Sequence, residues 1–310
     1  MTLQEKINHS IALIRKAEKL ALAMQPDEGF HVGFSGGKDS QAVLELVKMA
    51  GVKYRAVYNV TTNDPADNVR FIKHHYPDVE FSIPEKSYFQ LIAQKGVPTM
   101  FNRWCCALFK ETAGVGYVVL TGVRKEESRK RAAYEEVGKW GRTKDKKESV
   151  DLDKMEANEF RCVGGKDKFM VYPILEWTEK DVWDFIALRG LPVNPCYKTH
   201  KRVGCVFCPF ARPKEIRAYC ETHPQLKAAF IHAIDRYRER ERERDRQKLP
   251  SAEDYFDWWL SHISLDEYIA KKRQMEIDFN PDTVSDHQPD SVSDHQPDSV
   301  SASRPNSDIR

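Results

Sequence analysis

The sequence lacks the long apolar runs of membrane proteins and the large net charge that attracts nucleic acid or a membrane surface. Its 49 lysines and arginines are nearly balanced by 47 aspartates and glutamates, which leaves a formal net charge of +2 over 310 residues. So small a net charge gives no global field that would attract nucleic acid or a membrane surface. No apolar run in the sequence is long enough to cross a bilayer. We therefore expect no membrane association, and nucleic-acid binding gains no support from net charge.

The chain also lacks a disulfide framework, because its seven cysteines are grouped instead of being spread along the sequence. Grouped cysteines are typical of metal or redox chemistry in a reducing compartment. Residues 1–23 have the pattern of an amphipathic helix and not that of a signal peptide. These features predict a cytoplasmic protein. They say nothing about its oligomeric state.

Composition divides the chain into successive regions. The polar repeat VSDHQPDS occurs at 284–291 and again at 292–299, and so little apolar surface predicts disorder. The predicted organisation is a nucleotide-binding domain at 1–235 with a mobile insertion at 138–165, a charged helical extension at 236–280 and a disordered tail at 281–310.

Short apolar runs alternate with amphipathic patterns along the first 190 or so residues, which predicts an α/β fold with a parallel sheet covered on both faces. Ligands in such sheets bind at the carboxyl ends of the strands. The predicted strands are 30–34, 54–60, 79–83, 117–121 and 169–174. Helices are predicted at 67–75, 88–94, 178–187, 213–219, 225–247 and 255–263.

A glycine-rich turn follows the first predicted strand and reads Ser35-Gly36-Gly37-Lys38-Asp39-Ser40. The helix after it begins near Gln41, with Asp39 or Ser40 placed to cap it. Backbone N–H groups and the positive end of the helix dipole would converge there and bind an anion. The spacing does not fit the Walker A pattern, and the dinucleotide pattern G-x-G-x-x-G is absent. An ordinary glycine turn is the alternative.

Two further motifs lie beyond this turn. Residues 122–131 carry several cations after the strand at 117–121, and they could face the same anion or form a solvated basic loop. The other motif is a pair of cysteine pairs, Cys105-Cys106 and Cys205-x-x-Cys208. Adjacent cysteines share one zinc ion awkwardly, whereas a cubane cluster accepts them at different corners. Four thiolates thus favour a 4Fe-4S cluster, with zinc as second choice and core cysteines as the alternative.

Taken in order, these pieces resemble the phosphoadenylyl sulfate (PAPS) reductase family of the PP-loop superfamily, and most closely its iron–sulfur adenylyl sulfate reductase branch. The resemblance covers about residues 28–212. It implies a Rossmann-like adenine-nucleotide α-hydrolase fold, a loop at 35–40 with Gly122 that holds phosphate or sulfate, and arginines Arg124 and Arg131 that face it. It also implies that the four cysteines ligate the cluster. The pieces are Ser35–Ser40, Cys105-Cys106, Gly122–Arg131, Asp181-Val182-Trp183 and Asn194-Pro195 with Gly204-Cys205-x-x-Cys208.

The sequence departs from the family pattern in three places. Family reductases carry a catalytic cysteine in a C-terminal Glu-Cys-Gly-x-His segment, but no cysteine follows Cys220 here. Cys220 and His223 keep a Cys-x-x-His spacing, and the thiol could be activated or simply packed. Residues 59–62 replace the usual Asp-Thr-Gly, and Phe109 stands where an arginine is expected.

We therefore expect an enzyme that binds ATP or adenylyl sulfate, with Lys38, Arg124 and Arg131 acting on the anion. One reaction is reduction of the adenylyl sulfate or PAPS type, with Cys220 or a thioredoxin-like external thiol as nucleophile. The alternative is ATP-dependent sulfur transfer to a nucleic acid. A third possibility is a metal-stabilised nucleotide-binding protein without turnover.

Overall fold

The computed structural model describes residues 1–140, 148–149, 152, 168–240 and 248–279. It contains two compact units, Met1–His262 and Ile263–Arg310. The repeat tail and most of the predicted insertion lie outside the described residues. The predicted domain boundary at residue 235 falls inside helix α9 (Pro224–Arg238), next to the buried Ile234. In the second unit, helix α12 (Leu265–Phe279) carries a Lys271–Glu267 ion pair of 2.8 Å.

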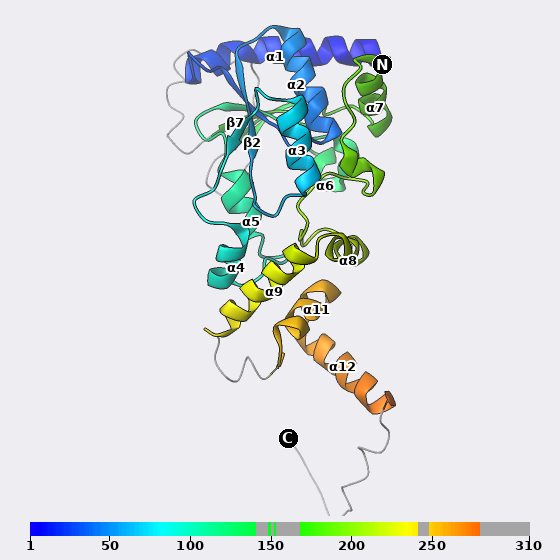
Figure 1. The fold of residues 1–310 in the computed structure, drawn as a ribbon. Helices are drawn as coiled ribbons and strands as arrows, with labels where there is room; N and C mark the ends of the chain where they lie inside the picture. Colours follow the sequence, from blue (N-terminus) through cyan, green and yellow to red (C-terminus); the bar gives the residue numbers. More distant parts are fainter. Residues whose placement is uncertain (141–147, 150–151, 153–167, 241–247, 280–310) are drawn as a thin grey trace, which may run out of the picture. The chain divides into compact units, whose positions relative to one another are not determined.

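A twisted, mostly parallel sheet organises the first unit (Figure 1). Its order in the described residues is β3-β2-β1-β4-β7-β5-β6. The neighbours from β3 through β7 are parallel, which confirms the predicted α/β class. The pairings of β5 with β7 and with β6 are antiparallel and were not predicted. The strands are β1 (Phe30–Gly33), β2 (Tyr54–Asn59), β3 (Glu80–Ser82), β4 (Val118–Leu120), β5 (Val137–Trp140), β6 (Glu148–Ser149) and β7 (Lys168–Val171).

One face of the sheet is buried under four helices that present apolar stripes. They are α1 (Leu3–Met24), α2 (Lys38–Ala50), α3 (Ala66–His75) and α7 (Glu179–Leu188). Alternate strand residues such as Phe30, Val32 and Leu120 point into this core, as the period of two requires. Thr2 and Glu5 form a capping box at the start of α1, which fixes where that helix begins.

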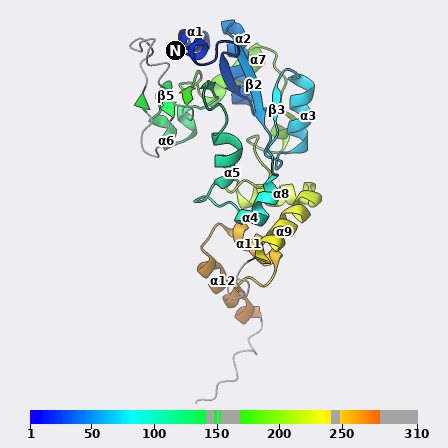
Figure 2. The ribbon, with the colours of Figure 1, turned by 90° about the vertical axis from the view of Figure 1, so that its left-hand side faces the viewer.

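A second core forms among helices on the other side of the first unit. In both ribbon views α4 (Tyr88–Lys95), α8 (Pro213–Thr222), α9 and α11 (Ala252–Ser261) lie together, away from α1 and α2 (Figures 1 and 2). Their shared core is aromatic and includes Tyr88, Phe230 and Trp259. The predicted helix at 255–263 is thus α11, and it packs against elements far from it in the chain.

The opposite face of the sheet has a smaller core, in which Val119, Met170, Tyr172 and Leu175 are buried. A further short helix is α6 (Arg129–Ala132). Helix α5 (Trp104–Cys106) continues into a π-helical turn at Ala107–Glu111. In the described part of the chain, no helix combines the length and apolarity that a bilayer crossing requires.

Candidate nucleotide and cysteine site

The glycine-rich turn joins β1 to α2, as predicted. Gly36 has φ = +76°, and a Cβ there would lie 2.3 Å from Asn68 Oδ1, so only glycine fits. The predicted cap was wrong: α2 begins at Lys38, and its N-cap is Gly37 with no side-chain hydrogen bond. Ser40 instead folds back, accepting from the Ser35 N–H at 3.1 Å and donating to the Gly37 carbonyl at 2.8 Å. The N-cap residue itself therefore supplies no side-chain acceptor to the first N–H groups of the helix.

Buried amides hold the turn in this conformation. Asn68 Nδ2 donates to the Ser35 carbonyl at 3.1 Å, and Asn194 Nδ2 donates to the Gly36 carbonyl at 2.9 Å. The two asparagines also bond to each other at 2.7 Å. Their exposed fractions are 3% and 0%, so breaking the network would leave polar atoms buried without partners. The Asn-Pro motif near residue 194 thus has a structural role at the turn.

Strand β4 is the neighbour of β1 in the sheet, and the residues after β4 contact the glycine-rich turn. A Cβ on Gly122 would lie 2.7 Å from the backbone carbon of Asp39, so the two segments touch. After β1 the chain adds β2 and β3 on one side of that strand, and it then adds β4 and β7 on the other side. The crevice between β1 and β4 is therefore a topological switch point. The predicted convergence of Gly122 with the turn is therefore present.

Two buried cations face this crevice. Lys38 and Arg124 are only 5% and 4% exposed. Lys38 Nζ lies 3.1 Å from Asp39 Oδ2 and 3.5 Å from Glu179 Oε1. Arg124 donates through Nε to Asp39 Oδ1 and through Nη1 to Glu126 Oε2, both at 2.7 Å. Carboxylates thus compensate both charges.

Arg131 is placed differently. It lies on α6 and forms an ion pair with Glu127, which also pairs with Arg202 at 3.2 Å. Burial lowers the pKa of Arg131, and the charge of Arg202 adds to this effect. Arg131 does not line either of the two cavities described below, so its predicted contact with an anion stays a prediction.

An open cavity of about 830 Å³ lies over Lys38 and Arg124. Trp183 and Tyr197 form part of its wall, with ring centroids 5.1 Å apart. The Tyr197 hydroxyl accepts a hydrogen bond from the Lys38 backbone N–H at 2.8 Å. Burial raises the pKa of Tyr197 to about 12, so the hydroxyl is neutral. It accepts the hydrogen bond of the Lys38 N–H, one of the backbone groups that the sequence predicted would bind an anion.

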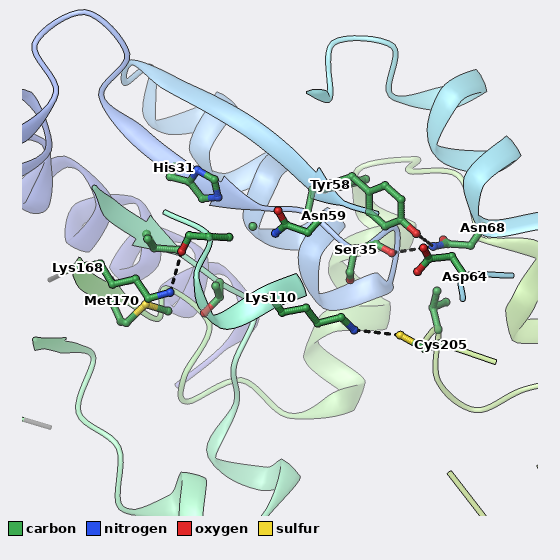
Figure 3. A pocket seen from close by; sticks show the side chains of 17 residues that line it. His31, Ser35, Tyr58, Asn59, Asp64, Asn68, Lys110, Lys168, Met170 and Cys205 are labelled. Carbon is green, nitrogen blue, oxygen red and sulfur yellow. Dashed lines mark hydrogen bonds between the residues drawn. The ribbon is translucent and has the colours of Figure 1, made fainter. Parts of the chain in front are cut away.

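A second cavity of about 230 Å³ lies on the other side of the turn, between Ser35 and the sheet face (Figure 3). His31 Nε2 and Thr121 Oγ1 belong to its lining residues, and neither atom has a hydrogen-bond partner among the described residues. Burial lowers the pKa of His31 to about 4, so its ring is neutral near pH 7. Buried polar atoms without partners are expected where a ligand supplies the missing bond. The other lining groups include Asn59, Asp64, Lys110, Lys168, Met170 and Cys205.

The two cysteine pairs come together although they are 100 residues apart in sequence. Tyr88 is fully buried beside them: burial raises the pKa of its hydroxyl well above the usual value, and the charges of all four cysteines add to the effect. Lys110 Nζ lies 3.3 Å from Cys205 Sγ, and Thr61 Oγ1 lies 3.5 Å from the same sulfur. Figure 3 shows Lys110 pointing across the small cavity toward Cys205.

The four cysteines are the residue type that binds zinc or an iron–sulfur cluster. Within the described ranges, however, no three or more His, Cys, Asp or Glu side chains are arranged to hold a single metal ion. A zinc ion with Zn–S bonds of about 2.3 Å would need sulfur atoms about 3.8 Å apart. A four-iron cluster accepts thiolates at separate corners and spaces them more widely. The assignment of Cys105, Cys106, Cys205 and Cys208 as ligands stays a prediction.

Cys220 lies on α8 and packs against the second core. Burial raises the pKa of its thiol, and Lys227 and Arg217 oppose that shift. The neighbouring His223 directs Nδ1 to Thr222 Oγ1 at 2.8 Å. Cys220 lines neither cavity. These contacts match the packing alternative and give no support to a nucleophile.

Sequence reasoning missed several groups that the fold brings to the site. Lys110 follows Cys106 by four residues, a spacing that places both on one side of a helical segment and could have been noticed. Tyr197 lies three residues after Asn194, inside a motif that was recognised for other positions. His31 precedes the turn on a strand, where its burial was not distinguishable from that of its apolar neighbours.

A family model for the phosphoadenosine phosphosulfate reductase domain matches residues 30–211. An uncharacterized protein of Methanocaldococcus jannaschii is 23% identical over 241 residues, which cover 74% of this chain and 52% of that protein. The chain therefore spans about half the length of that relative.

An adenosine 5'-phosphosulfate reductase of Staphylococcus haemolyticus is 24% identical over 188 residues, which cover 56% of this chain and 68% of that enzyme. Among solved structures, phosphoadenylyl-sulfate reductase from Candida auris gives a TM-score of 0.41 at 16% identity, covering 66% of this chain and 96% of that one. Because the family model spans the glycine-rich turn, Gly122, Arg124 and both cysteine pairs in one continuous match, this chain belongs to the phosphoadenosine phosphosulfate reductase domain family.

Proposed function

We propose that the chain binds an adenine nucleotide, ATP or adenylyl sulfate, around the turn at 35–40 and uses it in sulfur-related chemistry. The observation that carries this proposal is the pair of buried cations, Lys38 and Arg124, at the switch point beside the N-terminus of α2. The phosphates would lie over these cations in the larger cavity. The nucleoside would enter the smaller cavity, where His31 and Thr121 offer polar atoms without partners.

Nucleotide binding would exchange one set of anionic partners for another. Lys38 and Arg124 now pair with Asp39, Glu126 and Glu179. A phosphate or sulfate group can accept the same charge-assisted hydrogen bonds in bidentate geometry. It would also replace the Tyr197 hydroxyl at the Lys38 N–H. The cations would then stabilise charge that develops on the leaving oxygen during the reaction.

The first candidate reaction is reductive cleavage of adenylyl sulfate. An external thiolate attacks the sulfur, the bond from sulfur to the phosphate oxygen breaks, and AMP leaves with that electron pair. A second thiolate then attacks the thiol-derived sulfur of this S-sulfonate (R–S–SO3−), so that the bond to the sulfonate group breaks, sulfite leaves and a disulfide forms. The thiols are oxidised and the sulfate sulfur is reduced. We assign the thiol to an external donor because Cys220 packs away from both cavities.

The second candidate is ATP-dependent sulfur transfer. The packing of Cys220 favours it over a reductase whose nucleophile is Cys220, because sulfur transfer needs no thiol at that residue. An acceptor oxygen attacks the α-phosphorus and pyrophosphate leaves. Hydrosulfide then displaces AMP from the activated acceptor: a bond to sulfur forms and the bond to the adenylyl oxygen breaks, with no change of oxidation state. Pyrophosphate, which reduction of adenylyl sulfate does not release, is the product that distinguishes this reaction.

The four cysteines would hold a 4Fe-4S cluster at the edge of the smaller cavity. Such a cluster would supply electrostatic stabilisation to a bound anion, not the electrons of the reduction. Lys110 would connect the two regions, because its ammonium group reaches Cys205 and also lines the cavity. The thiolate charge of Cys205 raises the pKa of Lys110 above its ordinary value, which keeps this group cationic.

Product analysis tests the proposal. Purified protein is incubated with adenylyl sulfate and reduced thioredoxin, and sulfite and AMP are measured. A parallel reaction contains ATP, a sulfide donor and nucleic acid, and pyrophosphate is measured. Sulfite supports the reductase, and pyrophosphate supports the transferase. Nucleotide binding without either product would support the third possibility, a binding protein without turnover. Absence of nucleotide binding would refute the whole proposal.

A further inference from the structure

Positive charge is concentrated in two segments of this nearly neutral chain. Residues 95–112 and 198–217 together hold nine lysines and arginines against two glutamates, a net charge of +7, whereas the whole chain carries +2. These segments contain both cysteine pairs. The rest of the chain is therefore net acidic, and the basic character belongs to the surroundings of the cysteines.

The same two segments expose aromatic side chains. Phe101 is 98% exposed at the tip of a turn that the Asn102 N–H closes by donating to Thr99 Oγ1 at 3.0 Å. Phe210 is 56% exposed and lies two residues after Cys208 of the Cys205-x-x-Cys208 motif. The almost fully exposed ring of Phe101 buries no apolar surface when the chain folds. Both aromatic positions therefore suit a partner with flat apolar faces.

A contact between the two segments brings Arg103 and Phe210 together. The Arg103 guanidinium lies 5.4 Å from the centre of the Phe210 ring, which brings the turn at 99–102 beside the second motif. Helix α8 begins three residues after Phe210 and exposes Lys214 and Arg217, which share one side of the helix at i, i+3 spacing. We define these five residues, Phe101, Arg103, Phe210, Lys214 and Arg217, as the Phe101–Phe210 surface.

This surface adjoins the candidate site. Lys110 belongs to the segment at 95–112, and Cys205 belongs to the segment at 198–217; their hydrogen bond lies in the wall of the smaller cavity. The 198–202 stretch lines the larger cavity as well. A chain-like anion that follows the basic segments would therefore pass both cavities.

We propose that the Phe101–Phe210 surface binds single-stranded nucleic acid and presents it to the candidate site. Cations would contact successive phosphates, and bases would stack on Phe101 and Phe210, the combination on which single-strand binding depends. A duplex hides its base faces, so it would gain only the charge contribution. An acidic protein would pair with the cations but would leave Phe101 without a stacking partner. The assignment of this strand as the sulfur acceptor rests on the proposed function, whereas the binding does not.

Fluorescence anisotropy with labelled oligonucleotides of about 16 nucleotides tests the proposal. The full chain is titrated into single-stranded RNA, single-stranded DNA and the matching duplex, without ATP, at about 50 mM salt and again at about 200 mM salt. We expect a single strand to bind at least about tenfold more tightly than the duplex, because stacking is available only to the single strand.

Variants locate the binding. Phe101→Ala and Phe210→Ala should each weaken single-strand binding by about 5-fold or more, while Ile83→Ala, which truncates another exposed apolar side chain (76% exposed), should not. Lys214→Ala with Arg217→Ala should reduce the slope of log affinity against log salt by about 1.4. The control with the same charge change is Lys19→Ala with Lys48→Ala, on exposed positions of α1 and α2.

Three results would overturn the proposal: no single-strand binding at the lower salt concentration, equal affinity for duplex and single strand, or unchanged affinity after Phe101→Ala and Phe210→Ala. Binding of polyglutamate through the same residues, without binding of oligonucleotides, would assign the surface to an acidic protein instead. Calorimetric titration with ATP separates this outcome from failure of the proposed function, because neither phenylalanine lines either of the two cavities described above.

Discussion

At the scale of single residues, Lys38 is the position on which nucleotide binding depends most. Its ammonium is buried between Asp39 and Glu179. Lys38→Ala should weaken ATP binding by at least about 30-fold, since a charged hydrogen bond of roughly 2 kcal/mol is lost. Isothermal titration calorimetry measures the effect. Lys48→Ala, at an exposed position of the same helix, is the control, and equal ATP affinity in both variants would contradict the assignment.

Tyr197 gives a prediction of opposite sign. Its hydroxyl now accepts the Lys38 N–H, so an incoming anion must displace it. Tyr197→Phe should therefore tighten pyrophosphate binding by about 2- to 10-fold, the equivalent of one neutral hydrogen bond of roughly 0.5–1.5 kcal/mol. Calorimetry with pyrophosphate measures this. Tyr172→Phe, a buried position in the small core of the opposite sheet face, should have no effect. Weaker binding by Tyr197→Phe would mean that the hydroxyl contacts the ligand.

His31 makes stability depend on pH. Its pKa falls from 6.5 to about 4 on folding because the ring is buried. As the pH drops below 6.5, the unfolded chain takes up the proton first, so the free energy of unfolding decreases until the pH reaches the folded-state value. From about pH 7.5 to about pH 5, we expect a loss of about 2 kcal/mol.

Urea unfolding of the ligand-free protein at the two pH values measures the loss. His31→Gln should remove most of this difference, whereas His232→Gln, at an exposed position of α9, should leave it unchanged. If both variants retain the full pH dependence, other groups are responsible for it.

At the scale of elements, α11 holds the second core together. Trp259 is 4% exposed, lies 5.0 Å from Phe230 between ring centroids, and donates through Nε1 to the Pro98 carbonyl at 2.7 Å. Trp259→Ala should lower the free energy of unfolding by about 3–5 kcal/mol, because it leaves a large cavity. Urea unfolding measures it. Trp258→Ala is the matched control: that ring is half-buried and its Nε1 has no partner in the described part of the chain. Equal losses would contradict the role of Trp259.

The elements also separate what the sequence could predict from what it could not. Strand β1, strand β2 and helix α7 follow their periodicity, and their observed ends lie within a residue or two of the predicted ones. Strand β5 was missed because Val-Gly-Lys-Trp has too little apolar alternation, and its pairing with β7 depends on a partner about 30 residues away. The Asn68–Asn194 bond is of the same kind: neither residue reveals its partner locally. Hydrophobic periodicity in the sequence predicts individual helices and strands. How these elements come together around the site depends on contacts between residues far apart in the chain.

At the scale of the whole molecule, the fold brings two distant thiol pairs to one place beside a cavity, and this convergence makes a specific chemical prediction. Protein purified without oxygen should contain about four irons and four sulfides per chain and absorb near 400 nm, as thiolate-bound clusters do. Cys205→Ser with Cys208→Ser should abolish both, whereas Cys196→Ser and Cys220→Ser should not, because neither of these thiols belongs to the two predicted ligand pairs. One zinc ion per chain without sulfide would contradict the cluster and would support zinc, the second choice that the sequence left open. Retention of iron after the paired substitution would show that the ligands lie elsewhere, and Lys110 would then lose its role as the link between cluster and nucleotide.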